Sequence, residues 1–408
     1  MGYKFSKVFK INLYGSFDEY DADFDDGFMF ADANNVAKSN QYRIGIAPEF
    51  KYNRGSIVLN AAYNDIEREY ESAYPSKSNA QSISVDLYNK YNFNDKFYTV
   101  VGLNFQENEM ESFSIPYGET DFAQVINPDD AGFTIVDPYA NVVYVSGTGL
   151  NVNAGLRLNN HSEYGSHFVY SVNPSLKKDM SFGYVKTLAS YSTAYITPSL
   201  YQLFEPTYGN SELDPEENRT IEVGAELGIS ERATFNVVYF NRKETNFIDF
   251  VDLGNWVFHY NNIDESFTAS GIELNADYNF SKSFKLKTNA TYTKVEDDLN
   301  LRIPEIKINA KLNYQLNEAT FMSVSYQFND DRADAFYNSE TYATEDVNLE
   351  SYSLLNFYIS HKLINNKVTL FTNLTNLLNA DYQELYGYST KGRNINIGFN
   401  LSFRSEER

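Results

Sequence analysis

Apolar and polar residues alternate with a period of two along almost the whole chain, and this pattern constrains the fold more than any other feature. Near the C-terminus Ile395, Ile397 and Phe399 alternate with Asn396 and Gly398. A period of two places successive side chains on opposite faces of a β-strand. Because helical periodicity is nearly absent, the pattern predicts an all-β protein.

We read about eighteen strands, each about ten residues or longer. Their approximate ranges are 7–17, 42–53, 55–68, 82–93, 97–106, 138–146, 149–160, 166–177, 182–195, 219–229, 232–251, 256–280, 284–296, 305–315, 319–329, 350–362, 367–376 and 392–403. No linker or repeat beyond the hairpin period divides the chain. We therefore predict a single domain over residues 1–408.

The connections between these strands alternate between short and long. Tight turns are expected at 53–55, 94–96, 147–149, 230–231, 281–282 and 365–366. Long connections are expected at 18–41, 69–81, 107–137, 196–218, 330–349 and 377–391. One end of the sheet would then carry tight turns and the other end long loops, an asymmetry typical of transmembrane β-barrels of the outer membrane.

The aromatic content supports a membrane barrel. The 408 residues include 34 Tyr and 31 Phe but one Trp, and many of these rings fall near strand ends, where girdles at the two membrane interfaces are expected. Mean hydropathy is −0.46, so the second face of the sheet must be polar, as in a wet or plugged lumen. In lipid the sheet has to close, because every backbone donor needs a partner. A soluble β-rich surface protein is the alternative.

Composition excludes several other classes of function. The net charge of −22 argues against nucleic acid as a partner, and the lack of cysteine excludes disulfides, Fe–S clusters and thiol catalysis. Four histidines occur without metal-ligand spacing, namely His161, His167, His259 and His361. We predict no enzyme.

The acidic segment 18–27 is a candidate metal site. Asp21, Asp23 and Asp25 alternate within it and Asp26 adds a fourth carboxylate. Oxygen ligands crowded on a loop suit Ca²⁺. The alternative is a solvated acidic loop.

Three of the expected loops are rich in aromatic residues. The candidate ligand-binding residues are Tyr117, Phe122, Tyr201, Phe204, Tyr208, Tyr386 and Tyr388, with Phe133 and Tyr382 nearby in sequence. Aromatic side chains on long loops above a rigid scaffold form small-molecule sites in many proteins. Packing of the loops against one another explains them equally well.

Several motifs resemble those of TonB-dependent outer-membrane receptors. Within 194–226 the matching residues are Tyr208, Gly209, Asn210, Leu213, Pro215 and Glu216. A following strand matches at Asn262, Gly271 and Glu273. The C-terminal hairpin matches at Asn373, Leu374, Asn376, Leu377, Asp381, Tyr382, Gly392 and Arg393, and Phe403 fits the terminal Phe of such barrels.

The segment 386–388, followed by Gly392 and Arg393, resembles the vitamin B12 (cobalamin) receptor branch most. The resemblance implies import of cobalamin or another corrinoid, and it also implies Ca²⁺ on aspartates of early extracellular loops. A ferric siderophore or haem remains the alternative ligand. The implied partners are membrane lipid, lipopolysaccharide, the small-molecule ligand, TonB and a surface lipoprotein.

The chain also departs from the family pattern. The resemblance implies a barrel of about 22 strands filled by an N-terminal plug, whose Ton box contacts TonB. We find neither plug nor Ton box and about four strands too few. We therefore expect a partial barrel. The alternative from another class is a plugless passive pore.

Overall fold

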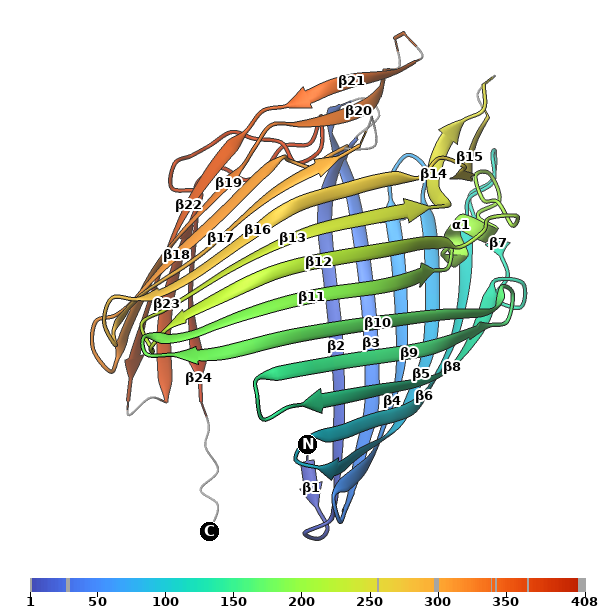
Figure 1. Cartoon of the computed structure of the whole chain (residues 1–408). Helices are drawn as coiled ribbons and strands as arrows, with labels where there is room; N and C mark the ends of the chain where they lie inside the picture. Colours follow the sequence, from blue (N-terminus) through green and yellow to red (C-terminus); the bar gives the residue numbers. More distant parts are fainter. Residues whose placement is uncertain are drawn as a thin grey trace.

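The computed structural model describes residues 2–26, 30–254, 257–296, 301–338, 340–341, 343–364 and 367–402. Nearly all of them belong to strands, and these strands curl into a barrel-shaped wall (Figure 1). The elements are β1 (Gly2–Lys4), β2 (Phe9–Asp26), β3 (Ala31–Tyr52), β4 (Gly55–Glu71), β5 (Ser76–Asn94), β6 (Phe97–Ser114), β7 (Ala123–Ile126), β8 (Gly132–Val145), β9 (Leu150–His161), β10 (Gly165–Met180), β11 (Gly183–Ile196), α1 (Leu200–Phe204), β12 (Glu216–Ile229), β13 (Ala233–Thr245), β14 (Phe247–Asp252), β15 (Phe258–Ile263), β16 (Phe267–Asn279), β17 (Phe284–Val295), β18 (Ile306–Gln315), β19 (Thr320–Asn329), β20 (Arg332–Asn338), β21 (Ala343–Leu349), β22 (Tyr352–Leu363), β23 (Val368–Thr375) and β24 (Asn394–Leu401).

The wall is one antiparallel meander. Twenty strands form the main sheet, and setting aside the short β1 and β7 leaves the eighteen long strands that the sequence predicts. β14–β15 and β20–β21 are separate hairpins, so β13 pairs with β16 and β19 with β22. Within the described residues no pairing joins β24 to β2, and these two strands are the edges of the wall.

The predicted loop over 18–41 is wrong. β2 continues to Asp26 and β3 begins at Ala31, so the acidic segment is a strand. Its carboxylates keep the period of two, and opposite charges lie across it: Asp21 pairs in register with Lys38, whose Nζ lies 2.6 Å from a Glu71 carboxylate oxygen. The predicted loops at 69–81 and 107–137 are shorter for the same reason, because β4, β5 and β6 run on past the apolar part of the wall.

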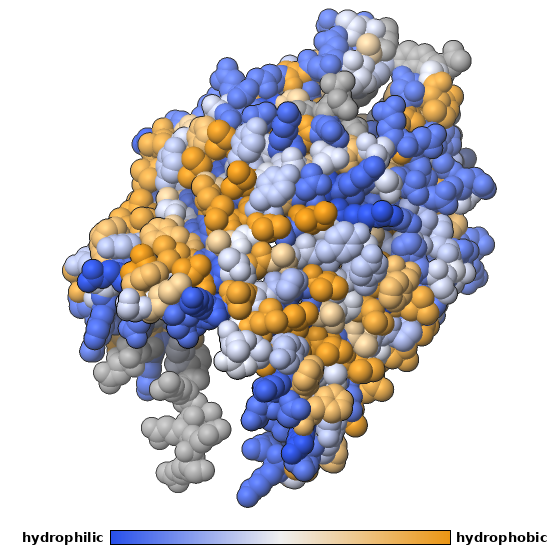
Figure 2. Space-filling view, viewed as in Figure 1, coloured by the Kyte–Doolittle hydropathy of each residue, from blue (hydrophilic) through white to orange (hydrophobic). Residues whose placement is uncertain are grey.

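The two faces of the wall differ in chemistry. The outer face carries exposed apolar side chains in register, such as Leu13 opposite Ile46 and Leu87 opposite Leu103. Figure 2 shows a broad apolar band across the middle of the molecule and a mostly hydrophilic surface at its upper right, where the long connections lie. The inner face carries Asn, Lys and Glu. No helix in the described part of the chain is long and apolar enough to cross a membrane.

Glycines on the inner face lie beneath aromatic rings of the neighbouring strand. A Cβ at Gly102 would lie 2.5 Å from the ring of Tyr139, whose hydroxyl donates to Asp86 at 2.9 Å. A Cβ at Gly271 would lie 2.1 Å from the backbone oxygen of Tyr292. Such pairs let adjacent strands approach and curve closely.

Candidate functional site

A small cap stands at the end of the wall that carries the long connections. It comprises α1 and the β14–β15 hairpin (Figure 1). α1 begins with a capping box, in which the Ser199 hydroxyl accepts from the Gln202 N–H at 3.2 Å and the Gln202 side chain accepts from the Ser199 N–H at 2.8 Å. The buried apolar side chains of the cap are Leu203, Leu213 and Ile248, with Phe204 and Tyr260 packed on them.

The motif at 208–216 holds this cap together. The Asn210 side-chain amide donates to the backbone oxygen of Tyr260 and to the Asn261 side chain, both at 2.9 Å. A Glu216 carboxylate oxygen accepts from the Ile248 N–H at 2.9 Å. The other motif residues of the segment are Tyr208, Gly209, Leu213 and Pro215, of which Leu213 is buried. The motif thus contributes to structure.

The C-terminal motif shapes the long connection between β23 and β24. Asn376 is buried with a φ of +48°, and its N–H donates to Asn356 at 2.8 Å. Its side chain donates to the backbone oxygen of Ala380 and accepts from the Ala380 N–H, both at 2.8 Å. Asn379 accepts from the Arg393 N–H at 3.1 Å. These contacts fold residues 376–393 back over the wall.

Asp334 fastens this connection to the β20–β21 hairpin. Its carboxylate is fully buried and accepts from Arg302 Nε at 2.7 Å, from the Tyr386 N–H at 2.8 Å and from the Ala335 N–H at 2.9 Å. A buried carboxylate needs such donors, because otherwise its desolvation is costly. Asp334 therefore fixes where Tyr386 lies.

Tyr386 belongs to an aromatic cluster that joins distant parts of the chain. Its ring stacks on Phe336 of β20 with centroids 4.4 Å apart, and it meets the edge of Phe30 at 5.3 Å. Phe30 lies between β2 and β3. A Cβ at Gly387 would lie 2.0 Å from the Phe30 ring, so this contact requires glycine there. The connection between β2 and β3 therefore touches the last long connection, between β23 and β24.

A cavity of about 660 Å³ opens between the inner faces of β4–β6 and the cap. Its lining includes Ile66, Arg68, Tyr70, Ser76, Ser78, Ala80, Met110, Ser112, Ser114, Val125, Tyr201, Glu205, Pro206 and Thr207. Burial and the Glu205 carboxylate raise the pKa of Tyr201, which keeps its phenol neutral and able to donate. Size and mixed aromatic and polar lining suit a small organic ligand.

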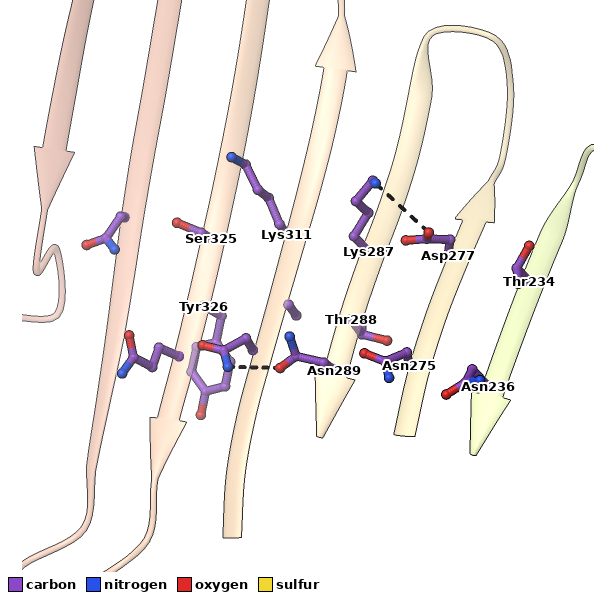
Figure 3. A pocket seen from close by; sticks show the side chains of 14 residues that line it. Thr234, Asn236, Asn275, Asp277, Lys287, Thr288, Asn289, Lys311, Ser325 and Tyr326 are labelled. Carbon is purple, nitrogen blue, oxygen red and sulfur yellow. Dashed lines mark hydrogen bonds and ion pairs between the residues drawn. The ribbon is translucent and has the colours of Figure 1, made fainter. Parts of the chain in front are cut away.

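A second, polar hollow of about 410 Å³ lies along the wall at β13–β22 (Figure 3). Amide side chains occupy one register row across five strands: Asn236, Asn275, Asn289, Asn309 and Gln327. In the next row Lys287 lies 3.9 Å from an Asp277 carboxylate oxygen. This part of the wall offers mainly amides and charged groups for hydrogen bonds to water or polypeptide, with Tyr326 as the aromatic residue in its lining, so the cavity beside the cap is the better candidate ligand site.

Comparison with known proteins decides the family. Residues 2–377 match the family described as TonB dependent receptor-like, beta-barrel. The chain belongs to this family. A relative, the vitamin B12 transporter BtuB of Vibrio cholerae serotype O1, is 27% identical over 253 residues, which cover 60% of this chain and 39% of that protein. The chain thus spans well under half the length of this curated relative.

Solved structures of TonB-dependent receptors share the fold. A variant of the ferric enterobactin receptor PfeA of Pseudomonas aeruginosa has a TM-score of 0.75 at 14% identity, covering 98% of this chain and 68% of its own. The copper transporter OprC has a TM-score of 0.78 at 13% identity, covering 98% and 71%. The family is one of outer-membrane barrels, so the end with long connections is the extracellular mouth.

The predicted ligand-binding aromatics of this receptor barrel do not form one group. Tyr201 lines the cavity beside the cap, Phe204 packs in the cap and Tyr208 meets the edge of Phe250 at 5.3 Å. Phe122 lies under Lys77 Nζ at 4.5 Å, while Tyr117 is fully exposed. Tyr386 lies in the aromatic cluster with Phe336, and Tyr388 follows Gly387 in the same connection. Their role in ligand binding stays a prediction.

The acidic strand and the histidines stand apart from the cavity. Asp21 and Asp23 follow one face of β2, Asp25 lies at the register shift between Phe24 and Asp26, and Asp26 ends the strand. Gly27 and the terminal Phe403 lie outside the described residues. Among the described residues no group of three or more His, Asp or Glu side chains is arranged to hold a metal ion. His161 is buried between Phe133 and Tyr164, and His167 stacks on Tyr195 at 4.2 Å.

Sequence reasoning missed Arg68, Tyr70 and Asp334. Arg68 is the last residue of the predicted strand 55–68, and Tyr70 lies beyond it on the same inner face of β4. Their alternation with Glu67, Glu69 and Glu71 was the available signal. Of the remaining motif residues, Asn373 is on β23, Gly271 and Glu273 are on β16, and Gly392 precedes Arg393 in the last connection.

Proposed function

We propose that this barrel captures a scarce organic ligand at its extracellular mouth for TonB-dependent import, with the cavity beside the cap as the capture site. The cavity is the observation that carries the proposal, since it joins the inner wall to the loops and offers two phenols, a cation and a carboxylate. A plug inside the wall, pulled by TonB, would release the ligand inward, as the resemblance implies.

A corrinoid is the ligand we favour, and a ferric siderophore is the second candidate. The relation to the Vibrio cholerae vitamin B12 transporter supports the first, and the fold shared with PfeA of Pseudomonas aeruginosa supports the second. The two differ in charge and shape, so competition at one cavity separates them.

Binding of cyanocobalamin to outer-membrane vesicles from cells that make the chain tests this proposal. Arg68→Gln combined with Tyr201→Ala should weaken binding about 10-fold or more, because both a charged and an aromatic contact are lost. Tyr74→Ala is the matched control, since Tyr74 is 90% exposed between β4 and β5. No corrinoid binding, with saturable binding of a ferric siderophore instead, would transfer the site to the second candidate.

A plugless passive pore is the competing function of another class. The polar inner wall along β13–β22 favours it. Steady conductance of the chain in planar bilayers, unaffected by ligand, would support a pore and contradict capture and import.

We also propose that Ca²⁺ binds at the carboxylates of β2. Asp21 and Asp23 follow the same face of the strand at the mouth. Addition of EGTA should then lower the affinity for the ligand, and Asp21→Asn with Asp23→Asn should remove that effect. An affinity that is the same with and without chelator in the unmodified chain contradicts the calcium role.

A further inference from the structure

The outer face of β12, β13, β16 and β17 carries an apolar groove of about 600 Å³. Small and large side chains alternate along it in register: Ala225 opposite Val237, Phe235 opposite Ala276, and Leu274 opposite Ala290. The polar residues between them, such as Asn236 and Asn275, belong to the inner face (Figure 3). The small side chains leave room beside the larger ones, so the groove is a recess in the part of the wall that faces hydrocarbon.

Three exposed cations lie above this groove, toward the mouth. Arg219, Lys243 and Lys294 continue the outward-facing rows of β12, β13 and β17. Within the described residues none of the three forms an ion pair or a hydrogen bond through its side chain. On the same face, Glu217 and Glu296 lie one pleat farther from the groove.

Arg219 and Lys243 lie directly opposite each other in register. Like charges in that position destabilise a sheet. An anion held between the two side chains removes this repulsion, and a phosphate matches both the charge and the donors of a guanidinium and an ammonium group. The pair therefore indicates an anionic occupant.

The spacing of cations and groove matches a lipid. Along β12, six residues separate Arg219 from Ala225, which is about 20 Å of strand and about 14 Å of membrane depth at a tilt of about 45°. One leaflet of the hydrocarbon core is about 15 Å thick. A phosphate at Arg219 thus places acyl chains of the outer leaflet in the groove.

The opposite sector of the wall has the reverse charge. Glu19, Glu67 and Glu109 are exposed on the outer face of β2, β4 and β6 just beyond the apolar rows. With a net charge of −22, the chain repels anions over most of its surface. Among the described residues, the sector at β12–β17 therefore differs from the opposite sector in carrying unpaired cations on its outer face.

We propose that this sector binds a phosphorylated, multiply acylated lipid of the outer leaflet, with the phosphate between Arg219 and Lys243 and acyl chains in the groove at Ala276 and Ala290. The proposal rests on the membrane placement that the proposed function requires, and on neither the ligand nor the import step.

Lipid that co-purifies with the full chain tests the proposal. The chain is extracted from outer membranes in nonionic detergent and the bound lipid A is measured by native mass spectrometry. Combined Arg219→Gln, Lys243→Gln and Lys294→Gln should lower bound lipid A about 10-fold. Lys38→Gln is the matched control, because Lys38 is an outward cation already paired with Glu71 at 2.6 Å. Equal retention in the triple variant overturns the proposal.

A second variant probes the groove with the cations intact. Ala276→Phe with Ala290→Phe fills the recess and should displace acyl chains, so the amount of retained lipid A should fall. The phosphate site should stay intact in this variant, so inorganic phosphate should still protect Lys243 from chemical acetylation. Unchanged retention of lipid A in this variant overturns the lipid assignment. So does a dimer of the unmodified chain that is lost in this variant, because a second copy would then occupy the groove. Heat-modifiable gel mobility of each variant establishes folding. If the unmodified chain is released from membranes without detergent, the proposed function fails, and this result is distinct from a failure of the lipid proposal.

Discussion

At the scale of single residues, Asp334 shows how a buried carboxylate positions a distant loop. It accepts from Arg302, from Tyr386 and from its neighbour Ala335, and so joins β20 to two segments that are distant from it in sequence. Without it the Tyr386 N–H and the Arg302 guanidinium lose a charged partner.

We expect Asp334→Ala to loosen the 376–393 connection by about 2 to 3 kcal/mol of local opening free energy. Trypsin should then cleave the folded chain faster after Lys391 and Arg393. Asp346→Ala is the control, since Asp346 is exposed on the same hairpin. Equal cleavage rates in the two variants would show that Asp334 does not anchor the connection.

We expect His161 to make the mouth sensitive to acid. Burial lowers its pKa from the usual 6.5, and its Nδ1 accepts from the Glu163 N–H at 3.1 Å, which requires an unprotonated nitrogen. A depressed folded-state pKa means that the unfolded state binds more protons below pH 6.5. The stability that neutral His161 contributes is present above that pH and is lost as pH falls through it.

Hydrogen exchange at the mouth ends of β8 and β9 should therefore accelerate between pH 7.5 and about 5.5, after correction for intrinsic rates. His161→Asn keeps an acceptor for the Glu163 N–H and does not titrate, so it should remove this acceleration. Acceleration that persists in the variant would assign the acid response to another group.

At the scale of elements, the strands were predictable and the cap was not. The period of two predicts a strand wherever one face is apolar, and most wall strands from β9 onward agree with the predicted ranges within a few residues. The predicted strands 232–251 and 256–280 are wrong in extent, because β13 ends at Thr245 and β16 begins at Phe267, with the β14–β15 hairpin between them. The same period underestimated the lengths of β2 to β6, because their mouth ends carry charged residues on both faces, a pattern typical of loops. Strands in water tolerate such residues when opposite charges pair across them. α1 and the β20–β21 hairpin depend on side-chain contacts such as Asp334 that have no periodic signal.

The aromatic residues of the candidate ligand site were predictable only in part. The aromatic content of the long connections indicates the mouth, but the sequence does not distinguish the rings that pack against other side chains from those that face the cavity. Phe204 packs in the cap and Tyr382 stacks on Tyr352 at 4.2 Å, whereas Tyr201 faces the cavity. These outcomes follow from how far α1 and the last connection fold back over the wall.

Gly271→Ala should weaken the pairing of β16 with β17. The added Cβ would meet the backbone oxygen of Tyr292 at 2.1 Å, and backbone cannot move aside as a side chain can. We expect a loss of about 3 kcal/mol, seen as a lower temperature for loss of heat-modifiable mobility. Gly147→Ala is the control, because no atom lies within 4 Å of a Cβ there. Equal shifts for both variants would contradict the packing argument.

At the scale of the whole molecule, β24 and most of β2 have a free edge within the described residues, and aromatic contacts at the mouth span the gap between them. Ile397 and Phe399 of β24 are 73% and 63% exposed, and β2 pairs along most of its length only with β3. Unpaired edges are unfavourable in lipid. At the mouth, however, Phe30 and Tyr386 bring the two ends of the wall together.

Phe30→Cys with Tyr386→Cys should be joined by a short bis-methanethiosulfonate reagent, because the two ring centroids lie 5.3 Å apart and the shorter Cys side chains leave a gap that the reagent spans. The chain has no cysteine of its own, so any cross-link is the engineered one. Faster gel mobility that a reductant reverses is the expected readout, and Tyr117→Cys with Tyr386→Cys should stay uncross-linked. If the first pair does not cross-link, the two connections do not touch in the membrane.

The same contact sets an order on biogenesis. Every wall strand pairs with its neighbour in sequence, so each hairpin can form soon after its residues are made. Phe30 and Tyr386, in contrast, are roughly 350 positions apart, and closing so long a segment is slow. The mouth is thus the last part to mature, and a chain interrupted before its final hairpin would have a nearly complete wall but no finished entrance.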